Sequence, residues 1–309
     1  MNKYIGLDIG GTKCAVVLGT EDGAILDRFV IPTGTCEETL TQLFDAIAAH
    51  HGYTAIGVSC GGPLNAVTGT ILSPPNLPGW DAVHITERLN ARFGVPAFLR
   101  NDADACAVAE WKYGAGRGTK NMIFLTCGTG MGAGLILNGR LYSGTTGSAG
   151  EVGHMRLTEF GPVGYGKIGS FEGYCSGGGI AQLGEMMARI HAQAGHPAAW
   201  TDGTITAKHL AEAALDGDDA ARKVWRLSAQ MLGRGISILI DLLNPELIVI
   251  GSIFQRSENL LRDDMERVIA EECLPHAAEA CRIVPAELGD QIGDIASLSI
   301  AVGGMKGEI

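Results

Sequence analysis

Two short glycine-rich segments have the composition of turns that hold a phosphate group. The first, Asp8-Ile9-Gly10-Gly11-Thr12-Lys13, places a carboxylate at the end of an apolar stretch, followed by two glycines, a hydroxyl and a lysine. The second, Gly128-Thr129-Gly130-Met131-Gly132, follows another apolar stretch. Glycine lets backbone N–H groups approach an anion closely, and Thr12 and Lys13 add donors. Either segment alone is more simply a hairpin turn, but the pair together favours phosphate binding.

The first segment differs from two better-known phosphate motifs. It lacks the Walker pattern GxxxxGK[ST], and the residues after it have the pattern of a strand, whereas the dinucleotide-binding motif opens a helix.

Asn101 and Asp102 lie where an apolar strand pattern gives way to a helix. Ligands bind at strand ends in open α/β sheets, although Asn and Asp are also common helix caps. With two phosphate turns in the chain, we expect Asp102 to act as a general base, while Asp104 in the first helical turn more simply serves the helix dipole. Asn76, within Pro75-Asn76-Leu77-Pro78-Gly79-Trp80, either binds a hydroxyl group or belongs to a loop fixed by prolines.

A third group of polar residues surrounds a glycine-rich loop. Glu151, His154 and Glu172 lie within residues 151–177, and that loop has no cysteine before Cys175. The residues alone allow a metal site, a sugar site or a flexible surface loop.

The elements that position these groups follow a pattern that occurs twice. Residues 3–9, 13–20 and 24–31 are apolar and separated by turn residues, which predicts an antiparallel meander. Thr35 and Glu38 then predict a capping box for a helix that ends near Ala49. A second strand–turn–strand unit covers 121–138, with a tight hairpin at Asn138-Gly139. Further strands are predicted at 54–60, 96–100, 247–251 and 282–286, and helices at 103–113, 176–195, 218–243, between the strands 247–251 and 282–286, and from about 293.

This order predicts an α/β protein with two lobes. We expect a small lobe of residues 1–115 plus about 291–309, to which the last helix returns, and a large lobe of residues 116–290. The glycine-rich stretch 114–118 marks the boundary.

Composition excludes several classes of protein. The chain has 309 residues, of which 46% are hydrophobic and 18% are charged, as in a globular protein with a sizeable core. A formal net charge of -11 argues against non-specific binding to nucleic acid or to an anionic membrane. The eight cysteines form no CxxC pair, and we find no secretion signal or membrane-spanning run. We therefore expect a cytoplasmic protein with free thiols.

The ordered set of motifs resembles the ROK family (repressors, open reading frames and kinases). The motifs DIGGTK, GGPLN, PNLPGW, NDADACAVAEW, GTGMG, GEVGH and FEGYCSG extend through nearly the whole chain. The resemblance implies the two-lobed actin-like ATPase, or ribonuclease H-like, fold and a sugar kinase that uses ATP and Mg²⁺. It also implies a homodimer.

The resemblance also assigns roles to residues. Asp8 would orient Mg²⁺ through water, and Asp102 would be the base. Three further sets follow: sugar hydroxyls would be bound by Gly62, Asn76, Asn101 and Asp102; the sugar's first two carbons would be contacted by Glu151, His154 and Glu172; ATP would be bound by Asp8, Gly10, Gly11, Thr12, Lys13, Gly128, Thr129, Gly130, Gly132 and Gly251. The family usually has two or three glycines at the last position, whereas this chain has Gly251-Ser252-Ile253.

A zinc loop typical of the family is altered in this sequence. ROK proteins commonly carry CxCGxxGCxE and a further histidine ligand, and here Val163, Tyr165 and Ser170 occupy the cysteine positions. Valine cannot bind zinc, and tyrosine and serine are poor ligands for it, so we expect no zinc site. Another partner must then fix the ring of His154; Tyr165 and Ser170 are the candidates.

The expected reaction is phosphoryl transfer from ATP to a hexose hydroxyl, most simply that on carbon six, with closure of the lobes excluding water. The acceptor is left open among glucose, allose, mannose, fructose and N-acetylhexosamines, with glucose as the default. Two alternatives are a sugar-sensing protein without catalysis and a transcriptional repressor. A repressor would need a DNA-binding segment ahead of the first strand. In this sequence Asp8, at the end of that strand, is already close to the first residue, so we expect no such segment.

Overall fold

The computed structural model describes residues 2–198, 200 and 203–309, and they form two compact units. Unit 1 comprises Met1–Phe124, Gly134–Ala149 and Glu287–Ile309, and unit 2 comprises Leu125–Ala133 and Gly150–Ala286. Residues 116–124 and 134–149, which we expected in the large lobe, are grouped with unit 1 here. The functional division into lobes stays a prediction.

A five-stranded sheet with the order β3-β2-β1-β4-β8 forms the centre of unit 1. The predicted meander is confirmed, because β1 (Lys3–Ile9), β2 (Lys13–Thr20) and β3 (Ile25–Pro32) are antiparallel neighbours. Strands β4 (Tyr53–Cys60) and β8 (Ala97–Asn101) continue the sheet in parallel with β1. Ile9 pairs with Cys60, and Cys60 pairs with Asn101, so these three strands end at one edge of the sheet.

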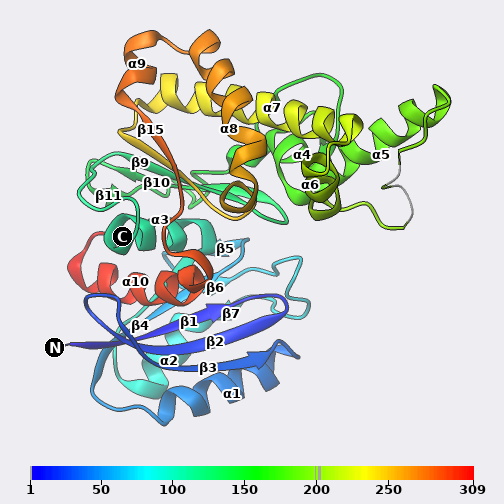
Figure 1. Cartoon of the computed structure of the whole chain (residues 1–309). Coiled ribbons are helices and arrows are strands. Elements are labelled where there is room, and N and C mark those ends of the chain that lie inside the picture. Colours follow the sequence, from blue (N-terminus) through cyan, green and yellow to red (C-terminus); the bar gives the residue numbers. More distant parts are fainter. Residues whose placement is uncertain (1, 199, 201–202) are drawn as a thin grey trace. The chain divides into compact units, whose positions relative to one another are not determined.

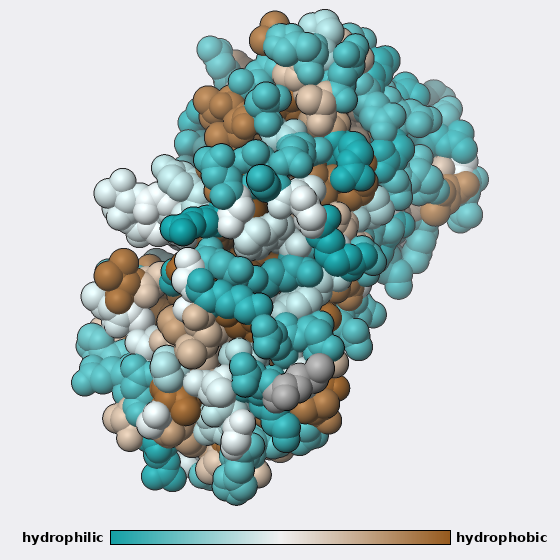
Figure 2. Space-filling model, turned by 90° about the vertical axis from the view of Figure 1, so that its left-hand side faces the viewer, coloured by the Kyte–Doolittle hydropathy of each residue, from teal (hydrophilic) through white to brown (hydrophobic). Residues whose placement is uncertain are grey.

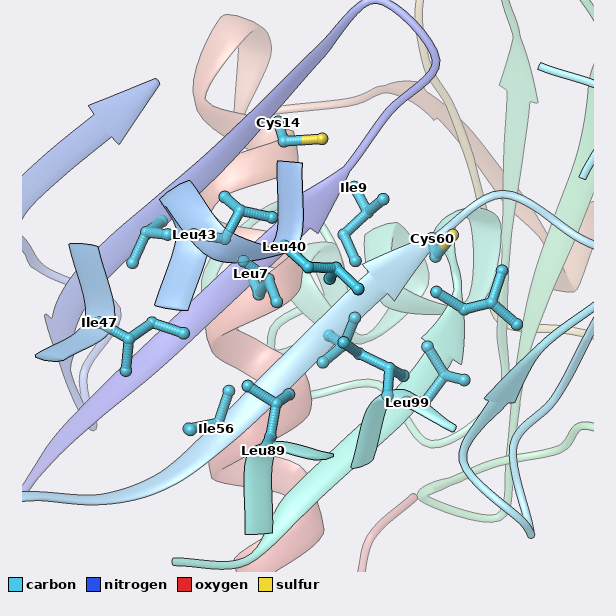
Figure 3. Close-up of a cluster of buried hydrophobic side chains, with 14 of the residues drawn as sticks. Leu7, Ile9, Cys14, Leu40, Leu43, Ile47, Ile56, Cys60, Leu89 and Leu99 are labelled. Atoms are coloured by element: carbon cyan, nitrogen blue, oxygen red, sulfur yellow. The ribbon is translucent and has the colours of Figure 1, made fainter. Parts of the chain in front are cut away.

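One face of this sheet carries the larger hydrophobic core of unit 1. Helices α1 (Cys36–Ala48) and α2 (Ile85–Phe93) contribute Leu40, Leu43 and Leu89, which meet strand residues such as Leu7 and Ile9 (Figure 3). Successive strand side chains point to opposite faces. Asp8, between Leu7 and Ile9, therefore points away from this core.

The opposite face is covered by α10 (Ile292–Lys306) and α3 (Asp102–Tyr113). Figure 1 shows α10, in red, alongside the blue strands of the sheet. The approach is close because β1 and β4 carry glycines where α10 crosses them; a Cβ atom at Gly57 would clash with backbone atoms of Ser297 and Ala301. Asp294, in the first turn of α10, lies on the same face of the sheet as Asp8.

Three short strands that the sequence did not predict hold the loop around Asn76. They are β5 (Leu64–Asn65), β6 (Thr70–Ile71) and β7 (Val83–His84), and they form a small antiparallel sheet. Between β6 and β7 the loop is closed by the Ser73 N–H, which donates to the Trp80 carbonyl over 3.1 Å.

The second five-stranded sheet has the order β11-β10-β9-β14-β15. Its strands are β9 (Met122–Cys127), β10 (Met131–Leu137), β11 (Arg140–Leu141), β14 (Leu247–Ile250) and β15 (Arg282–Pro285). Strands β9 and β10 each contribute residues to both units. The predicted hairpin at Asn138-Gly139 is confirmed, with φ of 54° and 72° at its two turn residues.

Unit 2 is otherwise mostly helical. The 25-residue helix α7 (Asp219–Leu243) packs against α4 (Phe171–Cys175), α5 (Gly177–Gln193), α6 (Ala207–Leu215), α8 (Ile253–Glu272) and α9 (Pro275–Ala280). The sequence predicted α5, α7 and α8 but not the shorter α4, α6 and α9. Between β11 and α4 lie the 3₁₀ turn η1 (Val152–His154) and the hairpin strands β12 (Val163–Gly164) and β13 (Lys167–Ile168). A further 3₁₀ turn, η3 (Gly289–Gln291), precedes α10 in unit 1.

One predicted detail is wrong. Helix α1 follows Thr35 as expected, but the Thr35 side chain accepts no bond from the backbone of the helix. Its hydroxyl instead donates to the Glu38 carboxylate over 2.6 Å, so the predicted capping box is not formed.

The surface and the cysteines agree with the sequence analysis. The face in Figure 2 is mostly hydrophilic, with hydrophobic residues in small separate groups. All eight cysteines are free thiols. Within residues 2–198, 200 and 203–309, no helix has the length and apolar character needed to cross a membrane.

The tight contact of α10 gives a test of the fold. We expect Gly57→Ala to lower the free energy of unfolding by about 1–3 kcal/mol, because the added methyl group meets backbone that cannot rotate away. Gly34→Ala is the matched control, since the nearest side-chain atoms there lie 3.5 Å or more from the new Cβ. Urea-induced unfolding measures both variants, and equal stability of the two would contradict the packing described.

Candidate functional site

The edge where β1, β4 and β8 end brings together most of the predicted residues of unit 1. Gly10 and Gly11 follow β1, Gly62 follows β4, and Asn101 ends β8. Because these strands are parallel and in register, their carboxyl ends deliver the three segments to the same place.

Two of these glycines make room for the amides expected to bind hydroxyl groups. A Cβ atom at Gly11 would lie 2.5 Å from the Asn76 carbonyl oxygen and 2.8 Å from its Cβ, so the Asn76 loop packs directly on the first glycine turn. A Cβ atom at Gly62 would lie 3.3 Å from Asn101 Nδ2. Asn76 itself is exposed, which leaves its side chain accessible to a ligand.

The first glycine turn is braced from one side and open on the other. Gly10 N–H donates to the Lys13 carbonyl over 3.2 Å, and the Thr33 hydroxyl donates to the Gly10 carbonyl over 2.6 Å. Gly11, Thr12 and Lys13 are exposed. Their donors can therefore reach an anion in solution.

Asn101 serves as a helix cap and still presents its amide nitrogen. Its Oδ1 accepts a hydrogen bond from Ala103 N–H over 2.9 Å at the start of α3. The cap and the ligand-binding interpretations, which the sequence left open, are therefore compatible, because the cap uses the oxygen of the amide and leaves Nδ2 available.

Asp102 is the first residue of α3, directly after the strand edge. Its Oδ1 also accepts from Ala103 N–H over 2.9 Å. The residue reaches solvent, yet the protein around its carboxyl group limits hydration, and this desolvation raises the pKa of Asp102 above its ordinary value. A carboxylate with a raised pKa is a better proton acceptor than an ordinary aspartate.

Asp8 has the most perturbed carboxyl group of the edge. Burial, together with the charges of Asp294 and Asp102, raises the pKa of Asp8 from 3.8 to about 6, against the opposing effects of Lys13 and Arg28. Arg28 is engaged by Asp294, whose carboxylate accepts from Arg28 Nε over 2.6 Å. Three carboxylates are thus concentrated on one face of the sheet.

This concentration of negative charge suits a magnesium ion. Mg²⁺ prefers oxygen ligands, keeps several waters, and is commonly held by one or two carboxylates together with substrate phosphates. Across the described ranges no group of three or more His, Cys, Asp or Glu side chains forms a complete metal cage. Asp8 beside the first glycine turn fits the water-mediated arrangement, because a cation there would offset its buried negative charge and the repulsion from Asp294 and Asp102.

The second glycine turn belongs to unit 2 and is braced within it. Gly128 N–H donates to the Gly130 carbonyl over 3.0 Å, and Gly177 N–H, at the start of α5, donates to the Gly128 carbonyl over 2.9 Å. Glu172 Oε2 accepts from Met131 N–H over 2.9 Å. A residue expected to bind sugar is therefore bonded to a turn expected to bind phosphate.

His154 and Glu172 lie close together beside this turn. A Cβ atom at Gly153 would lie 3.3 Å from the Cβ of Glu172 and would clash with the Met131 carbonyl. His154 ends η1 and is exposed, and Glu172 is half-buried in the first turn of α4. Glu151, the residue before η1, is exposed.

Ser252, which stands where the family usually has a glycine, adopts a backbone conformation typical of glycine. Ser252 has φ 54° and ψ -106°, a region that glycine adopts readily and other residues rarely. Its N–H donates to Gln255 Oε1 over 3.1 Å in a capping box that starts α8. Gly251 is buried, and its N–H donates to the Leu125 carbonyl over 2.9 Å.

Two of the residues at the family's cysteine positions, Tyr165 and Ser170, make packing contacts or hydrogen bonds within the loop. Ser170 is buried, and its hydroxyl accepts from Gly173 N–H over 3.1 Å as the cap of α4, so it does not reach His154. The ring of Tyr165 lies edge-on to the His154 ring, with centroids 6.2 Å apart. Of the two candidate partners, Tyr165 makes the contact.

Sequence reasoning missed several neighbours of these sites. Asp294, Gly293 and Arg28 surround Asp8, but nothing in the sequence separates Asp294 from an ordinary acidic residue in a first helical turn. Gly177 and the strained Ser252 flank Gly128. The sequence did show the unusual serine after Gly251, but it did not show that Ser252 lies beside Gly128.

The sequence matches the family described as "ROK family" over residues 4–302. It is 31% identical over 318 residues to a glucokinase of Streptomyces coelicolor, covering 97% of this chain and 98% of that protein. A crystal structure of a ROK family glucokinase from Streptomyces griseus in complex with glucose and AMPPNP is 30% identical, with a TM-score of 0.75 and coverage of 97% and 99%. A crystal structure described as a ROK family transcriptional regulator, a homologue of the E. coli MLC protein, is 26% identical, with a TM-score of 0.83 and coverage of 97% and 78%. The kinase structures have the actin-like ATPase fold, so the predicted fold class is confirmed.

The raised pKa of Asp8 predicts how stability depends on pH without ligand. Between pH 4 and 6 native Asp8 holds its proton more tightly than the unfolded chain, so this residue's contribution to stability is lost as pH rises through about 6. Asparagine cannot ionise. The free energy of unfolding of Asp8→Asn, relative to that of the wild type, should therefore increase by up to about 3 kcal/mol between pH 4 and pH 7. Urea unfolding at several pH values measures this gain, with the surface variant Asp45→Asn as control. A difference that stays constant with pH would contradict the burial of the charge.

The altered loop predicts the response to metal removal. Protein purified without chelator should contain no stoichiometric zinc, and EDTA should leave its melting temperature unchanged, because the loop is held by hydrogen bonds and packing. Elemental analysis and thermal unfolding test this. Equimolar zinc, lost together with a fall in melting temperature, would refute it.

Proposed function

The chain belongs to the ROK family, and we propose that it transfers the γ-phosphoryl group of ATP to a hexose hydroxyl, with carbon six of glucose as the default acceptor. The observation that carries this proposal is the position of Asp102. It lies at the strand edge beside the first glycine turn, contributes to the perturbed pKa of Asp8, and has a raised pKa itself.

The sugar is bound by amide and backbone groups of unit 1 in this proposal. Asn76 and Asn101 Nδ2 offer hydrogen-bond donors to hydroxyl groups, and Gly62 leaves the space beside Asn101. Glu151, His154 and Glu172 are proposed to contact the region of the ring's first two carbons. The glucose-bound structure at 30% identity supports a sugar as the small-molecule substrate.

Asp102 acts as the general base. The hexose oxygen forms a bond to the γ-phosphorus as the bond from that phosphorus to the β,γ-bridging oxygen breaks, and ADP leaves. The hydroxyl proton passes to the Asp102 carboxylate. Fixation of Asp102 by Ala103 N–H holds the carboxylate in one orientation, so that alignment of the reacting groups contributes much of the rate.

Both glycine turns bind phosphate oxygens in the proposed reaction. Thr12 and Lys13 add a hydroxyl and a positive charge to the first turn, and Thr129 adds a hydroxyl to the second. Asp8 would hold Mg²⁺, and a bound magnesium ion would supply positive charge to the phosphates. The AMPPNP complex of a related glucokinase supports ATP as the donor. Gly251 contacts the adenosine portion.

A regulator that senses sugar without catalysis is the alternative, because a structure with a TM-score of 0.83 is described as a transcriptional regulator. A sensor has no need of an ionisable base at residue 102 or of a charged residue at position 8, and both are present. An assay for ADP release with glucose, allose, mannose, fructose and N-acetylhexosamines separates the two. Sugar binding without ADP release from any of them would favour the sensor.

We further propose a cytoplasmic homodimer with no nucleic-acid partner. Light scattering tests the dimer, and a DNA-binding assay tests the absence of a nucleic-acid partner.

The role of Asp102 gives the main prediction of this proposal. Asp102→Asn should lower kcat by about 10²–10⁴, because the amide cannot accept the hydroxyl proton. Sugar binding measured by calorimetry should persist, since the amide is isosteric with the carboxylate. Asp45→Asn on the surface should keep full activity. Turnover of Asp102→Asn near the wild-type rate would refute the assignment.

A further inference from the structure

A two-residue hairpin occupies the place of the altered loop. Strands β12 and β13 pair with Val163 opposite Ile168 and Gly164 opposite Lys167. The residues between them, Tyr165 and Gly166, both have positive φ, 44° and 74°. This is the geometry of a type I′ turn, whose first position favours asparagine, aspartate or glycine. A bulky aromatic residue is strained there and costs stability.

The strain at Tyr165 persists because hydrogen bonds fix both strands of the hairpin. Gln182 of α5 accepts from Val163 N–H over 2.9 Å and donates to the Val163 carbonyl over 2.8 Å. Arg156 Nη1 donates to the Ile168 carbonyl over 2.8 Å, and Gly169 N–H donates to the Pro162 carbonyl over 2.9 Å. The turn is therefore held in place from both sides.

Two residues of the hairpin contact His154. The rings of Tyr165 and His154 meet edge to face, at an interplanar angle of 73° and a centroid distance of 6.2 Å, within the range of favourable aromatic pairs. Lys167 Nζ donates to the His154 carbonyl over 2.8 Å. One contact orients the imidazole ring, and the other fixes the backbone that carries it.

The same hairpin also contacts the neighbour of Glu172. A Cβ atom at Gly164 would lie 2.6 Å from Gly173 N and 2.8 Å from the Cβ of Glu172. The residue next to Tyr165 therefore packs directly against the start of α4. His154 and Glu172 are thereby held in a fixed relation by one short element.

Burial of the Tyr165 ring does not compensate for the strained backbone, because 76% of this residue is exposed. A turn selected for stability alone would have asparagine at this position. The specific contact of the exposed ring is with His154.

We propose that Tyr165 is a positioning residue that sets the orientation of the His154 ring and so determines how the sugar is held, in place of a metal ion. This inference rests on the proposed function, in which His154 contacts the sugar. The fold itself does not require tyrosine in the strained turn, whereas orientation of the His154 ring does.

The experiment compares Tyr165→Asn with Tyr165→Phe. Asparagine suits the type I′ turn and removes the ring, so stability should be unchanged or higher while the sugar KM rises about two- to tenfold, the range expected for loss of one aromatic pair. Phenylalanine keeps the ring, so its sugar KM should match wild type. In both variants kcat should change less than KM, because Tyr165 does not touch the reacting atoms.

A second measurement is independent of kinase activity. In protein labelled with ¹⁵N-histidine, the imidazole nitrogen shifts of His154, assigned with His154→Gln, should change in Tyr165→Asn and be kept in Tyr165→Phe. If Tyr165→Asn leaves both the shifts and the sugar KM unchanged, or lowers stability in parallel with sugar affinity, the positioning role is wrong. Absence of hexose phosphorylation by the wild-type protein would refute the proposed function instead, and the histidine shifts would still decide the contact.

Discussion

Burial of carboxylates at the edge of the unit 1 sheet, together with their mutual repulsion, is the constraint on which the proposed site depends. Asp8, Asp102 and Asp294 are close enough that burial and mutual charge raise the pKa of Asp8 to about 6. Without ligand this arrangement opposes folding, and the surrounding sheet must offset it. In the proposed function the same arrangement would attract a cation beside the first glycine turn, and desolvation raises the pKa of the proposed base Asp102, so a local loss of stability is tied to the proposed chemistry.

The strand and turn pattern of unit 1 could be predicted because apolar strands and glycine turns follow local rules. Gly62 and Asn101 were assigned to one site only through the family resemblance, and the parallel pairing seen in the structure brings them with Gly10 to one edge of the sheet. Other contacts were out of reach of a single sequence. The effect of Asp294 on Asp8 joins residues at opposite ends of the chain, and its helix gives no local sign of it. The short strands β5 to β7 have too few residues for a periodic pattern.

In unit 2 the motifs were predictable and their mutual contacts were not. Glu172 and the second glycine turn were assigned to different ligands, yet Glu172 accepts from Met131 N–H, which belongs to that turn. Ser252 shows how a departure from a family pattern can leave backbone geometry intact, since the serine adopts a conformation that glycine favours. The loop around Tyr165 shows the converse. The three cysteines of the family's zinc pattern are replaced, and ring packing and hydrogen bonds between side chains and backbone hold the segment.

We propose above all that this chain moves a phosphoryl group from ATP to a hexose hydroxyl. Phosphorus NMR of the purified protein with glucose, ATP and Mg²⁺ tests it most directly, because it identifies the product. We expect a phosphomonoester signal coupled to the protons on carbon six, growing in step with ADP. Release of inorganic phosphate alone, or no change in ATP with glucose or any related hexose, would contradict it.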